Sequence, residues 1–388
     1  MRRGPTGDYE VTALGGEQVR AFVPWPLPPQ PPLVLDDVLQ AQLERATVAL
    51  GRLDSIGMLL PDPSLFLYAY VRREAVVSSQ IEGTQSSLSQ LLVFEADEAP
   101  GVPLDDVLEV SNYVAALEHG LSRMEGGFPL CNRLLREVHG RLLSGGRGAD
   151  KEPGVFRRSQ NWIGGTRPGN ARFVPPPPQR VEPCLADLER YLNADAGKQP
   201  ALIQAALAHV QFETIHPFLD GNGRVGRLLI VLLLHARGLL AQPLLYLSLF
   251  FKQHRAIYYE RLGAIREDGD WEAWLAFFLE GVEVTAGGAV ETTRRLLRLF
   301  DEDAALIRAH GERRTATLLA VHEVLKHRPV IALGPLAESA GVSFPTTSKA
   351  IEQLMVLGLV DELTGGRRNR LFGYRRYLDI LNEDMEPL

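Results

Sequence analysis

The sequence is poor in the features that mark secreted, disulfide-stapled or membrane-spanning chains. Its 388 residues include two cysteines, Cys131 and Cys184, which are too few for a disulfide framework and lack metal-ligand spacing. The longest unbroken apolar run, residues 228–234, is far too short to span a bilayer, and no apolar signal segment opens the chain. We therefore expect reduced thiols, a cytoplasmic location and no membrane contact.

A strong excess of one charge is also lacking. The chain has 41 Lys or Arg and 48 Asp or Glu, a formal net charge of -7. This balance argues against a protein that coats nucleic acid along its whole length, although it leaves room for a basic subdomain. With 45% hydrophobic and 23% charged residues and no internal repeat, the chain is long enough for two or three globular domains.

A polar, glycine-rich stretch at residues 216–227 separates two helical patterns. The upstream pattern ends near Ile215 and has apolar residues at helical offsets: Leu202, Ile203, Ala206, Leu207 and Val210. The downstream pattern begins near Gly223 and repeats in the same way: Val225, Leu228, Leu229, Leu232 and Leu233. The stretch therefore predicts a tight connection between two buried helices.

The residue types of this connection suit an anion. Gly221 and Gly223 allow a turn with positive φ and a close approach of the main chain to a ligand. The N–H groups of the first helical turn after Asn222 form an anion cradle, which the helix dipole strengthens. Arg224 and Arg227 can both reach over it with planar forks suited to phosphate oxygens. Because two arginines at a helix N-terminus oppose the dipole, their presence there indicates a bound anion.

Two further residues of the stretch carry chemistry. Asp220 supplies a hard oxygen ligand for Mg²⁺, and His216 is the side chain that can accept a proton near neutral pH. A polar surface loop with an incidental histidine is the simpler interpretation of a lone His or Gly pair, but it does not account for this ordered set.

The stretch resembles the signature of the Fic family, His-x-Phe-x-(Asp/Glu)-Gly-Asn-Gly-Arg-x-x-Arg, and matches it at every fixed position. The resemblance implies transfer of AMP from ATP to a Ser, Thr or Tyr hydroxyl of a target protein, with Mg²⁺. It implies His216 as the base and Asp220 as the metal ligand. The implied nucleotide-binding residues are Gly221, Asn222, Gly223, Arg224, Gly226 and Arg227, while Phe218 would anchor the loop in the core. The chemistry agrees, because in-line attack on phosphorus needs positioning, charge neutralisation and a proton acceptor.

Two other functions compete with AMP transfer. The Doc branch of the family transfers the γ-phosphate and carries Lys where this chain has Gly223, so Gly223 favours AMP transfer over a kinase. The second competitor is a DNA-binding regulator whose Fic core only senses nucleotide. An intact His216 argues against it, since a sensor needs no base.

An inhibitory motif is expected upstream. Residues 64–83 show helical spacing, Gly83 stands where a C-cap glycine would end the helix, and Ser78 and Glu82 share one face. This resembles the (Ser/Thr)-x-x-x-Glu-(Gly/Asn) motif of many Fic proteins. A capped surface helix is the alternative.

A hairpin is predicted between residues 160 and 178, where two β-prone runs flank a Gly-Thr-Arg-Pro-Gly-Asn turn. In the Fic resemblance it is the flap that registers the target segment by strand pairing, whereas a purely structural hairpin is the alternative.

Tyr258 and Tyr259 form a pair of which one is expected near the adenine, as in similar family members. Both could equally be core aromatics. They lie in the second of three expected helices, at residues 244–251, 254–265 and 271–284.

The C-terminal part is expected to be a separate unit behind a charged linker helix at residues 285–310. Helices at 315–326, 333–340 and 344–357, followed by β-prone runs at 359–374, resemble a winged helix-turn-helix. Residues 311–376 hold ten Lys or Arg against six Asp or Glu, about +4, and Arg367, Arg368 and Arg370 form a basic wing tip. DNA contact and protein docking are equally consistent with such a unit.

We therefore predict a mostly α protein: a Fic-type helical core with a short β-hairpin flap, plus a C-terminal winged helix-turn-helix. Residues 1–100 would hold an irregular N-terminal arm, up to about residue 35, and the inhibitory helix. Residues 101–290 would form the catalytic core and residues 311–376 the winged helix. The oligomeric state stays open, with a homo-oligomer among the alternatives.

Overall fold

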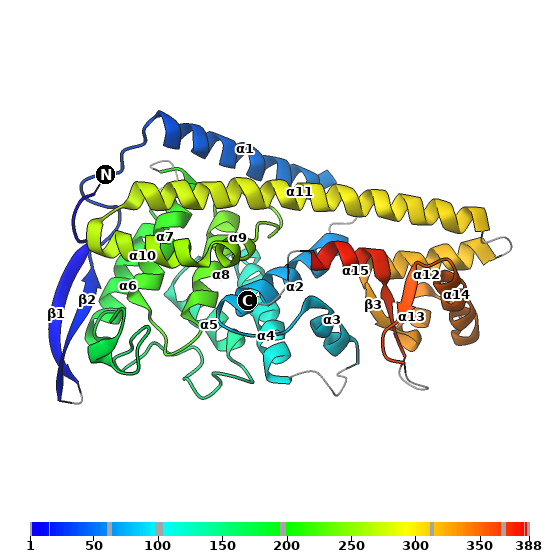
Figure 1. Cartoon of the computed structure of the whole chain (residues 1–388), viewed down its shortest axis with the longest axis horizontal. Helices are drawn as coiled ribbons and strands as arrows, with labels where there is room; N and C mark the ends of the chain where they lie inside the picture. The colour runs from blue at the N-terminus through cyan, green and yellow to red at the C-terminus, as the bar shows by residue number, and fades with distance from the viewer. Residues whose placement is uncertain are drawn as a thin grey trace.

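The computed structural model is mostly helical and describes residues 2–14, 16–59, 64–97, 104–194, 199–310, 314–365, 370–383 and 385 (Figure 1). Helices before the C-terminal unit are α1 (Asp37–Leu59), α2 (Ser64–Ile81), α3 (Leu88–Asp97), α4 (Leu104–Glu125), α5 (Asn132–Leu142), α6 (Pro178–Leu192), α7 (Ala201–Ile215), α8 (Asn222–Ala236), α9 (Ser248–Gln253), α10 (Arg255–Asp268) and α11 (Trp271–His310). Helices α3 and α6 were not predicted from the sequence, and α9 begins four residues later than predicted.

Helices α7 and α8 form the centre of the core. Nearly every residue of α7 is buried, and α8 is buried from Asn222 to Leu234 apart from Gly223. They pack on each other and are surrounded by α4, α5, α6 and α11. The predicted pair of helices around residues 216–227 is confirmed, and the polar connection between them is partly exposed at His216, Leu219 and Asp220.

Helix α11 runs along most of the molecule, with α1 packed beside it (Figure 1). The segments predicted as a helix at 271–284 and a linker helix at 285–310 are one continuous helix of 40 residues. The domain boundary predicted at residue 290 therefore falls inside a helix. By length and composition α11 could cross a membrane, but 56% of its apolar window is buried inside the protein, as in a core helix.

The N-terminal arm is not irregular as predicted. It forms an antiparallel hairpin of β1 (Gly7–Leu14) and β2 (Glu17–Pro24), in register from Gly7 opposite Pro24 to Leu14 opposite Glu17. Val19 and Ala21 are buried on either side of the exposed Arg20 and pack against Val174. This alternation is visible in the sequence, but it is short and lies next to a proline-rich segment at residues 24–32, so no strand was predicted there.

The flap is less regular than a hairpin. Its pairing is reduced to a single antiparallel bridge between Ile163 and Phe173, with a 3-10 turn, η1, at Pro168–Asn170. The carbonyl of Val174 accepts the Phe22 N–H of β2 at 2.9 Å, so the N-terminal hairpin lies against the flap.

The C-terminal unit contains α12 (Thr315–His327), β3 (Val330–Ala332), α13 (Leu333–Ala340), α14 (Phe344–Val356), β4 (Val360–Glu362), β5 (Leu371–Tyr374) and α15 (Arg375–Asn382). Its three predicted helices are present, and the expected wing strands join β3, which was missed, in a sheet of order β3-β5-β4. Arg367 and Arg368 lie outside the described residues. The winged-helix assignment stays a prediction.

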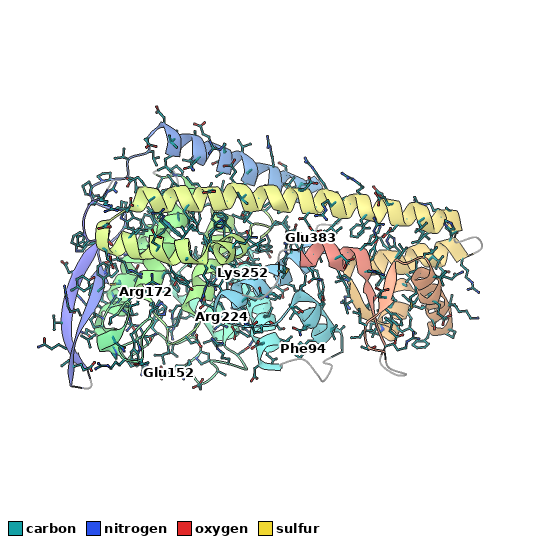
Figure 2. All side chains as sticks on the ribbon, viewed as in Figure 1. Phe94, Glu152, Arg172, Arg224, Lys252 and Glu383 are labelled. Atoms are coloured by element: carbon teal, nitrogen blue, oxygen red, sulfur yellow. The ribbon has the colours of Figure 1, made fainter. Side chains whose placement is uncertain are left out.

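This unit is not separate from the body. Glu383, labelled in Figure 2, pairs with Arg295 of α11 at 2.6 Å, and its carbonyl accepts Arg73 of α2 at 2.8 Å. The amide of Gln80, also on α2, donates to the Met385 carbonyl at 3.3 Å. The C-terminal segment therefore contacts the helix predicted to be inhibitory.

Candidate active site

His216 lies at the C-terminal end of α7. It is the C-cap residue, in the left-handed conformation with φ of 48°, and its N–H donates to the Phe212 carbonyl at 2.9 Å. Burial, followed by the positive charge of Arg157, lowers the pKa of His216 to about 4. The imidazole is therefore neutral at pH 7 and able to accept a proton.

The start of α8 supplies the predicted anion cradle. Gly221 precedes the helix with φ of 75°, and the first intrahelical bond runs from the Val225 N–H to the Gly221 carbonyl at 3.0 Å. The amides of residues 222–224 lie in the first turn, where no intrahelical acceptor exists. The positive φ predicted for Gly221 is confirmed, whereas Gly223 is an ordinary helical residue. Gly223 matters for space, because a Cβ there would clash with Glu82 Oε1.

Asn222 does not face the cradle as implied by the family resemblance. Its side chain is buried and closes the loop on itself, accepting the Phe218 N–H at 2.8 Å and donating to the Phe218 carbonyl at 2.9 Å. Because both amide groups are used within the loop, the Asn222 side chain holds the loop in shape, and its predicted contact with phosphate stays untested. Phe218 is fully buried, as expected of a loop anchor.

His139 of α5 supports the same loop. Its ring stacks on Phe218 with centroids 3.7 Å apart, and its Nδ1 accepts the Gly154 N–H at 2.8 Å. Nε2 therefore carries the proton and donates to the Asp220 carbonyl at 3.0 Å. Burial lowers the pKa of His139 to about 4, which keeps this arrangement neutral. A lone histidine on an apolar helical face gave no sequence signal for this role.

Arg227 contacts both polar residues of the predicted inhibitory motif. Its Nη2 donates to Glu82 Oε1 at 2.9 Å and to the Ser78 carbonyl at 2.9 Å, and its Nε donates to Ser78 Oγ at 2.8 Å. Helix α2 ends at Ile81, and Gly83 has φ of 101°, as predicted for the residue that ends the helix. Residues 149 positions apart in the chain thus form one site.

Arg224 does not lie free over the cradle as predicted. Its guanidinium is fully buried, with Nη1 2.6 Å from Glu109 Oε1 and Nη2 3.6 Å from Asp220 Oδ1. Figure 2 shows it within the helical body. Glu109 of α4 was not identified from the sequence, since one acidic residue in an amphipathic helix carries no signal. A grip of Arg224 on phosphate stays a prediction.

Asp220 fits a magnesium ion held mainly by substrate. Its Oδ1 accepts the Gly221 N–H at 2.6 Å, and its side chain is one-third exposed at the cradle. The described residues contain no group of three His, Cys, Asp or Glu placed to hold a metal. Mg²⁺ binds readily through one or two carboxylates plus phosphate oxygens, so a single carboxylate is a sufficient protein ligand.

Tyr258 takes the core alternative. It is buried, its hydroxyl lies 2.8 Å from His209 Nε2, and its ring stacks on Phe251 with centroids 4.6 Å apart. A ring covered in this way cannot stack on an adenine. Tyr259 is half-buried, with Arg255 5.5 Å from its ring centroid, and stays the candidate adenine neighbour.

Gly226 has a packing role, and its contact with nucleotide stays a prediction. Its carbonyl lies 2.8 Å from His209 Nδ1, and a Cβ at this position would clash with Glu213 Oε1. Burial raises the pKa of Glu213 to about 7, and Arg227 opposes this rise. The small residue therefore lets α7 and α8 approach closely beneath the cradle.

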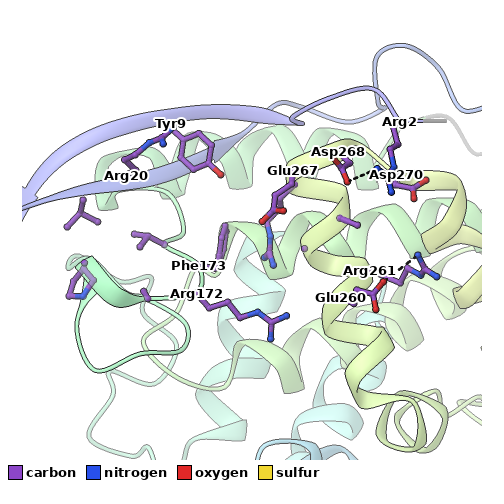
Figure 3. A pocket seen from close by; sticks show the side chains of 18 of the residues that line it. Arg2, Tyr9, Arg20, Arg172, Phe173, Glu260, Arg261, Glu267, Asp268 and Asp270 are labelled. Atoms are coloured by element: carbon purple, nitrogen blue, oxygen red, sulfur yellow. Dashed lines mark ion pairs between the residues drawn. The ribbon is translucent and has the colours of Figure 1, made fainter.

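A cleft of about 600 Å³ lies beside the flap, between the N-terminal hairpin and α10 (Figure 3). Phe173 of the flap lines it, and the Arg266 guanidinium lies 3.8 Å from the Phe173 ring centroid. Arg172 and Arg20 approach the cleft from the flap and from β2. A target segment would meet this mixed-charge surface beside the flap.

Two family models match the chain. The Fic/DOC family N-terminal model matches residues 40–122, and the Fic/DOC family model matches residues 129–234, which include the whole catalytic loop. The two matches together cover just under half of the chain and show a Fic domain at residues 129–234.

Curated relatives named "Protein adenylyltransferase Fic" include proteins from Culex quinquefasciatus, 32% identical over 210 residues, and Aedes aegypti, 33% identical over 213 residues. Each alignment covers 53% of this chain and 39% of the relative. The chain thus spans well under half the length of these relatives.

Solved structures confirm the fold. A Fic family protein from Desulfovibrio desulfuricans G20 matches with a TM-score of 0.59 and 23% identity, covering 89% of this chain and 98% of that one. Fic-1 from C. elegans (residues 134–508) matches with a TM-score of 0.53 and 22% identity, covering 66% and 74%.

Proposed function

We propose that the chain transfers AMP from ATP to a hydroxyl side chain of a target protein. The observation that carries this proposal is the loop that joins a neutral, buried histidine at the end of α7 to the free amides at the start of α8. The relatives named protein adenylyltransferase support it.

The chemical step follows from this arrangement. The target oxygen attacks the α-phosphorus, its proton passes to the His216 imidazole, and the bond from the α-phosphorus to the bridging oxygen breaks, releasing pyrophosphate. The negative charge of bound triphosphate favours the imidazolium and so assists proton acceptance. Mg²⁺, held by Asp220 and phosphate oxygens, would neutralise charge on the leaving group.

Transfer of the γ-phosphate is the competing reaction. In the family resemblance it accompanies a lysine in place of Gly223. A side chain at this position would meet Glu82 Oε1, so the resting arrangement of this chain depends on a glycine there. This supports AMP transfer.

The first prediction separates the two reactions. With Mg²⁺ and ATP labelled separately on the α- and γ-phosphates, protein-bound label should come from the α-position, on the chain itself or on a lysate protein. Gel autoradiography after removal of free nucleotide measures it. Label that arrives only from the γ-position would make the chain a kinase.

We also propose that the C-terminal unit binds duplex DNA weakly, and its local positive charge supports this. Several of its cations are already paired: Arg370 lies 2.5 Å from Glu362, and Arg376 2.8 Å from Asp303. The exposed face of α14 also carries Phe344, which is 56% exposed. Both facts lower the affinity expected for phosphate.

The second prediction is a mobility shift of duplex DNA by the full chain at low salt only. Because each phosphate contact releases counterions, affinity should fall steeply between 50 and 200 mM salt, by roughly tenfold or more. Lys349→Glu, on the exposed face of α14, should abolish the shift, whereas Lys151→Glu, far from this unit, should not. If no shift occurs at low salt, docking of a protein on α14 is the better account.

A further inference from the structure

Arg157 is a buried cation surrounded by backbone carbonyls. Its Nε donates to the His216 carbonyl at 2.8 Å, and its Nη2 donates to the carbonyls of Pro176 at 2.6 Å and Ile215 at 3.3 Å. Its Nη1 donates to the Ser159 carbonyl at 3.2 Å. Two acceptors belong to the end of α7 and two to the base of the flap, so one guanidinium joins both segments.

The electrostatics of the C-terminal end of α7 explain why a cation at Arg157 is stabilising. The last carbonyls of a helix lack intrahelical donors and carry the negative end of the dipole, which a cation stabilises. Burial nevertheless lowers the pKa of Arg157 to about 10, and no ion pair with a carboxylate compensates it within the described chain. A neutral cap would satisfy a helix end with less desolvation. The retained charge therefore indicates a role beyond stability.

The His216 side chain depends on this contact for its position. Its buried Nδ1 has no side-chain partner among the described residues, and the group that accepts from the imidazole is the backbone of Glu213, one turn earlier in α7. The backbone is left-handed, with φ of 48°, a conformation that a residue with a Cβ adopts only when its surroundings impose it. The atom that fixes this backbone from the flap side is Arg157 Nε.

We propose that Arg157 is a positioning residue for the proposed AMP transfer: it sets the base against the flap, so that seating of a target segment and alignment of His216 are coupled. The planar Arg157 guanidinium fixes the position of the His216 backbone relative to the flap through its hydrogen bonds to four carbonyls. The charge separately keeps the imidazole neutral. These two contributions can be separated by substitution.

The charged groups that face His216 are few. Arg157 and Arg266 oppose its protonation, Glu82 favours it, and the backbone of Glu213 accepts from it. Removing the Arg157 charge should raise the pKa of His216, so the base becomes protonated at a higher pH. The acidic limb of the rate profile should then move upward by about half to one pH unit.

The third prediction compares Arg157→Lys and Arg157→Gln in the full chain, with Arg158→Gln as the matched exposed control. The lysine variant keeps the charge and loses the fork. Its rate of α-label transfer should fall roughly tenfold or more at the plateau, with an unchanged acidic limb and unchanged affinity for ATP. The glutamine variant should lose rate and shift the limb. Arg158→Gln should match the unsubstituted chain in both.

A readout independent of activity distinguishes this proposal from the function on which it rests. NMR titration of ¹³C-labelled histidine, with His216 assigned by comparison with His216→Ala, should show a raised pKa in Arg157→Gln and not in Arg157→Lys. If the chain transfers no AMP but this pattern appears, the positioning role stands and the activity is wrong. If the lysine variant keeps the full rate, or the glutamine variant leaves the His216 titration unshifted, Arg157 is only a structural cap.

Discussion

Replacing His216 with alanine should reduce the transfer of α-labelled AMP by about 100-fold or more, the usual contribution of a general base. The other candidate bases near the start of α8, among the residues that the structure describes, already have partners. Asp220 is occupied by the Gly221 N–H, and His139 and His209 hold backbone and tyrosine partners in the core. The measurement is the initial rate of label incorporation with Mg²⁺ present.

The control for this variant is His310→Ala, at the exposed end of α11, which should keep the full rate. Affinity for ATP should also be retained in His216→Ala, because the phosphates are assigned to the amides of α8 and to Arg227. Full transfer by His216→Ala would remove the base from the mechanism. A chain that binds ATP but transfers nothing in any form would instead be a nucleotide sensor.

The central helices, and the shared helical face of Ser78 and Glu82, could be predicted from the sequence because they depend on local patterns; the inhibitory role of that face stays a prediction. The apolar periodicity on both sides of residues 216–227 determines α7 and α8 almost to the residue. The spacing of Ser78 and Glu82 places both on one face of α2, and in the structure both contact Arg227. Both predictions can be made from the residues of a short segment, without the rest of the fold.

The features that were not predicted depend on contacts formed in the folded chain, which the local sequence does not show. The contact of Arg224 with Glu109 of α4 was not predicted, because Glu109 lies more than a hundred residues earlier and has no local signature. The grip of Arg224 on phosphate stays a prediction. Asn222 was assigned to phosphate, whereas its amide closes its own loop on Phe218. The continuity of α11 was missed because its exposure changes along its length, from the core at Trp271 to contacts with α12 and α15. Such features are decided by tertiary packing.

We propose that the contact of Glu82 and Ser78 with Arg227 is inhibitory, because it obstructs the proposed phosphate site in two ways. Glu82 and Ser78 occupy the Arg227 fork, which is 2% exposed, so the clamp proposed for the γ-phosphate is already bound. Glu82 Oε1 also lies against Gly223, over the amides of the cradle. ATP could then bind only with its γ-phosphate displaced and its α-phosphate misaligned for attack. Misalignment of about 1 Å can cost on the order of 100-fold in rate.

Glu82→Gly should therefore raise the initial rate of AMP transfer by more than tenfold, a demand of only ~1.4 kcal/mol on the barrier. Glu82→Gln is the matched control, because it removes the charge but leaves a side chain over Gly223. The rate of Glu82→Gln should lie between those of the unsubstituted chain and of Glu82→Gly. Arg227→Ala should not raise the rate, since it removes the phosphate clamp together with the inhibitory contact.

Thermal unfolding offers a second test of the same contact. Without nucleotide, Glu82→Gly leaves Arg227 buried with only Ser78 as a partner and should lower Tm. The cost should be below the ~3–5 kcal/mol of a fully buried pair, because the Glu82 side chain is 28% exposed. ATP replaces the lost carboxylate with phosphate, so saturating ATP with Mg²⁺ should raise Tm more in Glu82→Gly than in the unsubstituted chain. An unchanged rate together with an equal ATP-induced shift in Tm would show that Glu82 only caps the last turn of α2.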